Sequence, residues 1–406
     1  MNSDYIQKSF KNNYFLFFIV VLFVIFIYYV AKKMATQKIN CQNIINTRGG
    51  EYNESYSFEE LNQMKYFTTT INHNNKKISY DCKLKDFYIK TAHNCCVSGK
   101  YKNDFVDLCA LNNCATYNVR ALDFQVYSLN SKPIVACSSI NTNFYKESYN
   151  NIPLIDTMER VNQLYFNSNN YDEYGFKTQF NNQSQNDPLF LIFRLHYGTN
   201  SNNGNYTDNK KQFYNQIYDI LTESFDNSKF NAIQMTSVYG SQFKNERNQI
   251  VPNIPMNQLS KRIFVFIVLN DDTDTSIIKT TKLDNIVDLY QEETLGFKTY
   301  DIKQLNSENN FKVGLETKNT LVFSKPNLSV YSNNPSFIDQ VSNGIQFIGM
   351  NFQTPDNNLK LYNDFFVNQY GGSLRYTNDT VNIVTCPYIK KPDNMISLPV
   401  GYNIFG

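Results

Sequence analysis

An uncharged run near the N terminus limits how this chain can fold. Residues Tyr14 to Ala31 read YFLFFIVVLFVIFIYYVA and contain no charged side chain. As a helix, this run would be about 27 Å long, close to the roughly 30 Å hydrocarbon core of a bilayer. Tyr14, Tyr28 and Tyr29 lie at its ends, where amphipathic rings prefer the membrane interface. We therefore expect a transmembrane anchor over 14–31, preceded by a short tail over 1–13.

A cleaved signal peptide is the alternative interpretation of this run. Its apolar segment would be shorter and would be followed by a cleavage site with small residues. Here the run ends in two lysines instead, which favours an uncleaved anchor in a single-pass membrane protein. Lysines on the C-terminal side slightly outnumber those on the N-terminal side, which leans towards a cytosolic C-terminal domain and leaves the orientation open. The lysines concerned are Lys8 and Lys11 (offset by Asp4) before the run, and Lys32, Lys33 and Lys38 after it.

The composition indicates a folded domain after the anchor. Hydrophobic residues make up 42% of the chain and charged residues 18%, which is enough to bury a core. The 38 basic and 36 acidic residues form no block of like charge, so we expect no nucleic-acid partner. Residues 32–80 are polar without clear periodicity and are interpreted as a stalk, and residues 81–406 as one domain.

Short apolar runs alternate with helical patterns after residue 81. Continuous apolar runs, such as Phe190–Phe193 and Phe264–Ile267, are typical of strands buried on both faces of a parallel sheet. Helical spacing is clear over 155–166 and 211–225. Strands alternating with helices over about 320 residues favour an α/β fold of the βα-barrel kind. The candidate strands are 86–90, 120–127, 133–136, 189–195, 263–269, 320–323 and 345–352.

Seven segments, in order along the chain, carry a family pattern. The most specific is Asn343–Pro355, which ends in Asn-Phe-Gln-Thr-Pro, and Asp86–Asn94 places a His-Asn pair after an aromatic-rich strand. Together the segments resemble the X and Y catalytic halves of phosphoinositide-specific phospholipase C. The resemblance implies a divergent TIM-type (β/α)8 barrel, with an X-like half at about 81–270 and a Y-like half at about 320–380. The remaining segments are Arg120–Asp123, Lys132–Cys137, Asp187–His196, Gln258–Val265 and Phe366–Gly372.

The resemblance also implies which residues would carry phosphoric diester hydrolysis. In the family, one His acts as general base and another as general acid, while Ca²⁺ held by one Asn and three carboxylates neutralises the developing charge. His93 matches the first catalytic His, Asn94 the first calcium ligand, and Asp123 one of the carboxylate ligands.

Other positions depart from the family pattern. Cys137 stands where the second catalytic His belongs, and Ala121 and Arg194 replace two calcium-binding carboxylates. The strand that should present phosphate-binding lysines reads FVFIV over Phe264–Val268, and the substrate-binding Arg of the Y half is missing. Ca²⁺ requires several charged oxygens, and a nearby guanidinium would repel it. We therefore expect no calcium cofactor, with Asn94 and Asp123 as vestigial ligands.

Arg194 and His196 leave two interpretations open. Because side chains alternate along a strand, both point to the same side. If that side is the barrel mouth, Arg194 could hold a phosphate bidentately, as an Arg does in metal-independent bacterial relatives, and His196 could complement His93. In the plainer interpretation, Arg194 pairs structurally with Asp123, and His196 is the His that already follows in the family pattern. Cys137 is a poor replacement acid, because an unperturbed thiol has a pKa of about 8.5.

The eight cysteines fit no zinc module, since Cys109 and Cys114 lack a second pair and the chain has only three His. Disulfides from Cys82, Cys95 or Cys96 to Cys109 or Cys114 are as consistent with the spacing as buried free thiols. His73 lies in an Asn-rich stretch and is expected at the surface. Sequons, which a chain rich in Asn yields by chance, occur at Asn53, Asn182, Asn205, Asn327 and Asn378.

Two functions are therefore considered. The first is a membrane-anchored phospholipase C-like protein with a degraded site, an inactive or weakly active pseudoenzyme that binds a lipid headgroup or serves a structural role. The second is a metal-independent phosphoric diester hydrolase acting on phosphoinositide or a related diester through His93 and Arg194. The single anchor, the lack of companion domains and the Asn/Lys/Tyr-rich composition suit the membrane of a large DNA virus, as well as a protozoan or slime mould.

Overall fold

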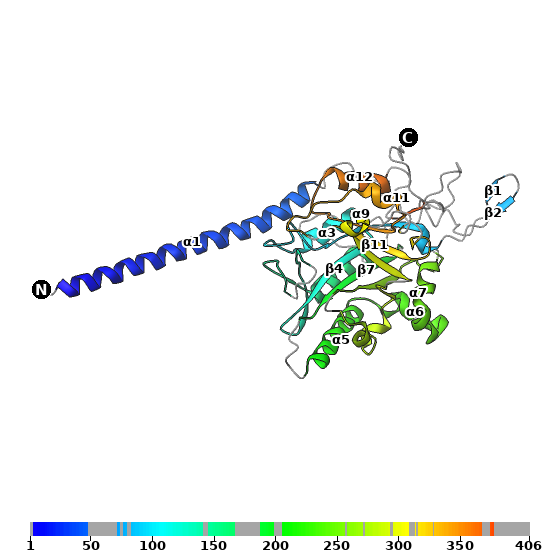
Figure 1. Cartoon of the computed structure of the whole chain (residues 1–406), viewed down its shortest axis with the longest axis horizontal. Coiled ribbons are helices and arrows are strands. Elements are labelled where there is room, and N and C mark those ends of the chain that lie inside the picture. The colour runs from blue at the N-terminus through cyan, green and yellow to red at the C-terminus, as the bar shows by residue number, and fades with distance from the viewer. Residues whose placement is uncertain are drawn as a thin grey trace.

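The predicted strands form most of a barrel in the computed structural model (Figure 1). Eight strands follow the order β10-β11-β12-β3-β4-β7-β8-β9, and each is parallel to its neighbours. A parallel bridge between Gln291 and Phe297 links the two end strands, so the barrel is nearly closed. The strands are β3 (Phe87–Ala92), β4 (Ala121–Leu129), β7 (Leu189–His196), β8 (Ile263–Val268), β9 (Leu289–Tyr290), β10 (Phe297–Asp301), β11 (Leu321–Lys325) and β12 (Phe347–Met350).

Helices connect the strands and cover the outside of the barrel (Figure 1). The two predicted helices are α4 (Leu154–Phe166) and α5 (Tyr206–Ser224), whose buried apolar residues recur at helical spacing. The α/β TIM-type barrel expected from the sequence is thus confirmed. The other helices are α3 (Leu108–Thr116), α6 (Asn231–Tyr239), α7 (Gln242–Ile250), α8 (Thr275–Ile278), α9 (Ile302–Ser307), α11 (Phe337–Ser342) and α12 (Asn357–Val367), with short 3₁₀ turns at Leu84–Asp86, Asn227–Lys229, Val251–Asn253 and Lys282–Asn285.

The structure describes most of the barrel and one long N-terminal helix. Residues 48–70, 74–75 and 79–80 of the predicted stalk lie outside the described residues, as does the side chain of His73. Also outside them are most of the segment Phe366–Gly372, Cys82, Cys386 and the sequons at Asn53, Asn182 and Asn378. The described residues are 3–47, 71–73, 76–78, 83–140, 145–166, 187–198, 205–255, 258–270, 273–292, 295–307, 313, 316–327, 329–367 and 374–376.

Phenylalanine rings fill the inside of the barrel. The ring of Phe190 lies 4.8 Å from that of Phe264, and the ring of Phe266 lies 4.8 Å from that of Phe297. These residues are fully buried, and burying each such side chain contributes about 1.5–3 kcal/mol. A second apolar layer packs between the strands and the surrounding helices. The apolar floor leaves the carboxyl ends of the strands as the place where inward-facing polar side chains gather.

Among the described residues, five strands lie outside the barrel proper. β5 (Lys132–Val135) and β6 (Ile152–Pro153) extend the sheet antiparallel from β4, and β13 (Leu374–Tyr376) pairs antiparallel with β3. β1 (Ile71–His73) and β2 (Lys76–Ile78) form a separate hairpin. The sequence patterns missed β9, which has two residues, and β10, whose residues after Phe297 are only half-buried.

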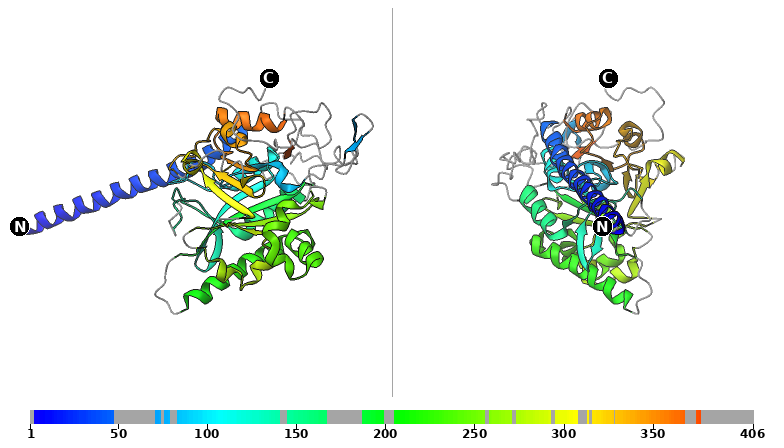
Figure 2. Two further views of the ribbon diagram at one scale, coloured as in Figure 1. Left: turned by 45° about the vertical axis from the view of Figure 1, so that its right-hand side comes forward. Right: turned by 90° about the vertical axis from the view of Figure 1, so that its left-hand side faces the viewer.

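The N-terminal anchor prediction corresponds to one helix, α1 (Ser3–Thr47), which projects from the barrel (Figure 2). Its segment Tyr14–Ile44 is long and apolar enough to cross a membrane, and none of its most apolar window is buried in the protein. The first part of the expected stalk, residues 32–47, continues this helix instead of forming an irregular linker. The helix thus reaches the barrel without a break.

The cysteine pairing differs from the candidates given by the spacing. Cys109 forms its disulfide with Cys41 of α1, 68 residues earlier in the sequence. Cys95, Cys96 and Cys114 are buried and form no disulfide, so none of them pairs with Cys109. The sequence spacing of the cysteines favoured partners close in the chain. It could not show that the C-terminal part of α1 packs on α3 and places Cys41 beside Cys109.

Candidate functional site

Inward-facing side chains on or just after four barrel strands make the candidate site, level with the carboxyl end of β3. His93 and Asn94 follow β3, Asp123 lies on β4, Arg194 on β7, and Lys325 ends β11. Because parallel strands end at the same rim, these side chains lie near the mouth, where βα barrels carry their active sites. All of them are at most 7% exposed.

Asp123 is the centre of this cluster. Its Oδ1 accepts a hydrogen bond from Arg194 Nε (3.0 Å), and its Oδ2 accepts one from Arg194 Nη2 (2.6 Å). Oδ2 also lies 2.7 Å from His93 Nδ1, in a close electrostatic contact that is not aligned as a hydrogen bond. Burial alone would raise the pKa of Asp123, but Arg194 and His93 hold it well below its usual range. Asp123 is therefore ionised and paired.

Asn94 connects the guanidinium to the imidazole. Its Oδ1 accepts from Arg194 Nη2 at 2.5 Å, and its Nδ2 lies 3.2 Å from His93 Nε2. Because the arginine can only donate, the amide oxygen faces Arg194 and the amide nitrogen donates to His93 Nε2. The lone pair of His93 is thus engaged, and its proton belongs on Nδ1 beside Asp123. The residue holds this position with a positive φ of 48°, which Asn tolerates.

Both site histidines are neutral at physiological pH. Burial lowers the pKa of His93 to about 4 and outweighs the opposing attraction of Asp123. Burial and the charge of Arg194 lower the pKa of His196 to about 3. A general acid or base works best with a pKa near the operating pH, so neither imidazole suits proton transfer in this arrangement.

His196 lies apart from the Asp123 network. Its ring stacks on Tyr127 with 4.5 Å between the centroids, and its Nδ1 lies 3.3 Å from Asn270 Nδ2. Within the described residues, His196 Nε2 has no hydrogen-bond partner. His196 is thus held by stacking on Tyr127, and its Nε2 makes no hydrogen bond within the described residues.

Cys137 follows β5 and is 1% exposed. Its thiol faces the carbonyl oxygen of Ser138 at 3.8 Å, and burial raises its pKa well above the ordinary value. A buried neutral thiol is a very weak acid. In this environment Cys137 is not suited to act as the general acid that the family resemblance places at this position.

The sequence patterns missed Lys325 and Tyr101, two residues at the mouth. Burial lowers the pKa of Lys325 to about 8, and its charge interacts with those of Arg194 and Asp123. Tyr101 donates a hydrogen bond to Asn351 Oδ1, and its ring meets that of His93 edge-on, 5.8 Å away. A signal for Lys325 was available, because a lysine lies two residues after the predicted strand 320–323 and ends β11 (Leu321–Lys325). Tyr101 lies in a loop without periodicity.

The arrangement does not fit a calcium ion. Arg194 Nη2 contacts both Asn94 and Asp123, the two residues that the family resemblance assigns as ligands. Asp123 is the one carboxylate in this network, and both of its oxygens already accept from Arg194. Since Ca²⁺ needs six to eight oxygens and is repelled by a cation, the residues of this network do not fit the ion.

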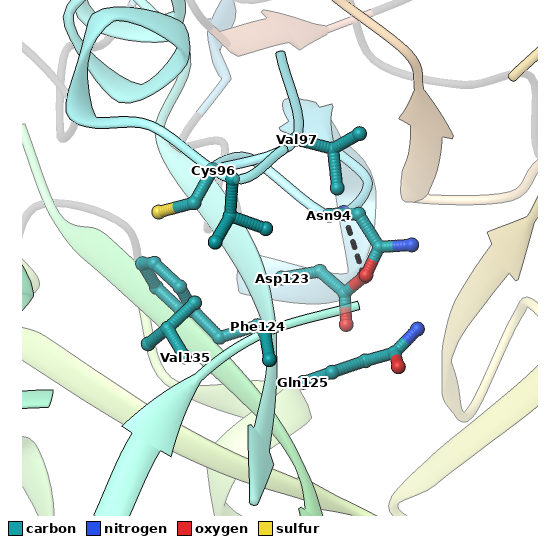
Figure 3. Close-up of a pocket in the computed structure, with 9 residues that line it drawn as sticks. Asn94, Cys96, Val97, Asp123, Phe124, Gln125 and Val135 are labelled. Atoms are coloured by element: carbon teal, nitrogen blue, oxygen red, sulfur yellow. Dashed lines mark hydrogen bonds between the residues drawn. The ribbon is translucent and has the colours of Figure 1, made fainter. Parts of the chain in front are cut away.

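The space beside Asn94 and Asp123 is small. Figure 3 shows Asp123 and Gln125 projecting to one side of β4, while Phe124 projects to the other. The gap there is lined by nine residues and leaves no room for a water molecule. The lining residues are Asn94, Cys96, Val97, Val106, Asp123, Phe124, Gln125, Val135 and Ala136.

No protein-family model matches the sequence, and no curated protein matches it. Among solved structures, PLC21 from S. officinalis and PLC21 from L. pealei each align with a TM-score of 0.50 and 14% identity. The alignment covers 71% of this chain and 36% of theirs, so this chain spans little more than a third of their length. A calcium-dependent phosphoinositol-specific phospholipase C from Pseudomonas sp. aligns with a TM-score of 0.44 and 8% identity over 73% of this chain and 96% of its own. The fold of this chain is that of a phospholipase C-like barrel.

Proposed function

We propose that this chain is a membrane-anchored, phospholipase C-like pseudoenzyme that binds an anionic headgroup or serves a structural role without hydrolysing phosphodiesters efficiently. The observation that carries the proposal is the position of Arg194, whose guanidinium binds Asp123 bidentately and also contacts Asn94. A barrel that needed calcium at this position would have to expel a buried arginine first.

The proton-transfer groups support the same proposal. His93 has its Nε2 engaged by Asn94 and its pKa lowered to about 4. Cys137 replaces the second histidine and holds its proton far too tightly to exchange it during turnover. Loss of one general acid or base typically slows a reaction by about 10²–10⁴-fold. In this chain both the calcium site and the general acid would be impaired. The two reductions in rate would therefore combine.

The charges that remain favour an anionic ligand. Arg194 and Lys325 bring two positive charges against the fully buried negative charge of Asp123, while His93 and His196 are neutral. Asp301 also interacts with Lys325, but it is only half-buried at the end of β10. A phosphate on a lipid headgroup, such as a phosphoinositide, matches this net positive charge. α1 would hold the barrel at a cellular or virion membrane, where such headgroups are concentrated.

One observation favours the second candidate, a metal-independent phosphoric diester hydrolase. Arg194 Nη1 and His196 Nε2 have no hydrogen-bond partner within the described residues, although both side chains are buried. In this alternative, Arg194 Nη1 would bind a phosphate oxygen, and His93 would accept the attacking hydroxyl proton once Asn94 moves away from its Nε2.

A hydrolysis assay separates the two candidates. The full chain in vesicles is incubated with phosphatidylinositol, and in parallel with soluble glycerophosphodiesters, either with Ca²⁺ or with a chelator. The pseudoenzyme proposal predicts turnover no higher than that of the His93→Ala variant under both conditions. Turnover with chelator that His93→Ala abolishes would overturn this proposal and support the hydrolase. Binding of phosphoinositide vesicles, compared with neutral vesicles, tests whether the headgroup is recognised.

A further inference from the structure

The part of α1 beyond its apolar run packs directly on the barrel. Cys41 and Ile44 are buried against Cys109 and Ala110 of α3, and Cys41 is joined to Cys109 by a disulfide. Two polar contacts flank this cluster. Gln37 Nε2 donates to Asp107 Oδ2 at 2.8 Å, and Asn40 Nδ2 donates to Asp104 Oδ1 at 3.0 Å.

A second contact lies at the end of the apolar run. The ammonium of Lys33 lies 4.3 Å from the centre of the Tyr149 ring, and the hydroxyls of Tyr29 and Tyr149 are 3.5 Å apart. Tyr29 is inside the predicted span and Lys33 is two residues beyond it. If α1 crosses a bilayer, Tyr149 therefore lies at the level of the headgroups, where tyrosine rings are favoured.

The loop that carries Tyr149 presents further apolar surface. Tyr145 is 78% exposed and Tyr149 39% exposed. Lys146 Nζ donates to the backbone carbonyls of Ser148, Tyr149 and Asn150, so the loop is held in a defined shape. Cys41 lies ten residues after Ala31, about 15 Å further along the helix axis. The disulfide thus fixes the barrel close to the membrane surface, and the loop with it.

We propose that the Cys41–Cys109 disulfide clamps the barrel to its own membrane helix on the oxidising side of the membrane and holds the Tyr145–Asn150 loop against the lipid headgroups. The inference rests on the membrane anchoring in the proposed function. The predicted lean towards a cytosolic domain rested on a small difference in lysine number, whereas disulfides persist mainly in oxidising compartments.

The chemistry of the clamp is ordinary thiol–disulfide exchange. The thiolate of Cys41 or Cys109 attacks a protein disulfide of the oxidising compartment, and the second thiolate then displaces that oxidant as a dithiol. Two thiol protons and two electrons leave the pair, and one S–S bond forms between α1 and α3. Removing the bond leaves the helix held by the non-covalent contacts described above, which are the polar contacts of Gln37, Asn40, Tyr29 and Lys33 and the packing of Ile44.

A fluorescent probe tests the position of the loop, because the chain contains no tryptophan. The variant Tyr145→Trp places one indole in the loop of the full chain, reconstituted in vesicles with lipids brominated near the headgroup. Tyr239→Trp, at the end of α6 on the far side of the barrel from α1 (Figure 1), is the matched control; Tyr239 is 49% exposed. We expect strong quenching at position 145 and none at position 239. Equal quenching at both positions overturns the proposal.

Three further measurements complete the test. Digestion without reductant should yield the Cys41–Cys109 peptide from protein made in cells, and its absence overturns the clamp. Cys41→Ser should reduce the quenching at position 145, and unchanged quenching overturns the role of the disulfide. The exposed Asn205 sequon should be glycosylated in membrane-inserting extracts; a protease-accessible, unglycosylated barrel on the cytosolic side overturns the topology. Extraction of the whole chain by alkaline carbonate would instead contradict the anchoring itself.

Discussion

Replacing Arg194 by leucine should strongly destabilise the barrel at neutral pH. Arg194 and Asp123 are 2% and 0% exposed, so removing the guanidinium leaves a buried carboxylate without its main partner. Breaking a buried ion pair in this way costs about 3–5 kcal/mol, against about 0–1 kcal/mol for an exposed pair. The matched control is Lys282→Met, which breaks the exposed pair with Asp219.

The pH dependence of the stability lost in Arg194→Leu gives a second readout. In the wild type, Asp123 has a depressed pKa, so its contribution is present above its unfolded pKa and is lost only as the pH falls through the much lower folded value. Without Arg194 the folded pKa of Asp123 rises, and the variant takes up a proton on mild acidification. The difference in free energy of unfolding between wild type and Arg194→Leu should therefore shrink from pH 7 to pH 5.

Urea denaturation of the full chain in detergent, followed by circular dichroism, measures these differences. Asp123→Asn closes a double-mutant cycle, in which we expect a coupling of about 1–3 kcal/mol. A loss below about 1 kcal/mol for Arg194→Leu, or additive effects in the cycle, would refute the argument that this ion pair holds the end of the barrel together.

Two other changes test particular contacts. Gly349→Ala should cost about 1–3 kcal/mol, because its Cβ would lie 2.9 Å from the Phe323 ring and 3.0 Å from the Ser324 carbonyl oxygen; a variant as stable as wild type in urea contradicts this packing. Lys325→Met should raise the free energy of unfolding at pH 7 by about 3 kcal/mol, because folding lowers the lysine pKa from 10.5 to about 8. The gain is full below pH 8 and fades as the pH rises towards 10.5, so an equal gain at both ends of this range would show that the lysine charge is not its cause.

The barrel could be predicted from the sequence because its strands carry a strong local signal. The runs Phe190–Phe193 and Phe264–Ile267 are apolar on both faces and lie in β7 and β8, as expected. β9 and β10 gave no such signal: two residues show no periodicity, and β10 reads FKTYD with one buried residue. β9 and β10, the two strands at the ends of the barrel sheet, therefore depend on pairing with neighbouring strands more than on the strand propensity of their own residues.

The sequence could identify individual candidate residues of the site, but not the hydrogen bonds that connect them. His93, Asn94, Asp123 and Arg194 were identified from the family resemblance, and the plainer pairing of Arg194 with Asp123 is present in the structure. That Asn94 fixes the tautomer of His93 depends on side-chain orientation, which no pattern contains. The Cys41–Cys109 bond likewise depends on where a helix outside the barrel returns to its surface.

Titration of the purified full chain with Ca²⁺, followed by isothermal calorimetry, tests most directly whether Arg194 takes the place of a metal ion. Because Arg194 binds both oxygens of Asp123, we predict no saturable binding up to about 10⁻³ M, the weak limit of protein calcium sites. Saturable one-to-one binding in this range that is lost in the Asp123→Asn variant would contradict the proposed site.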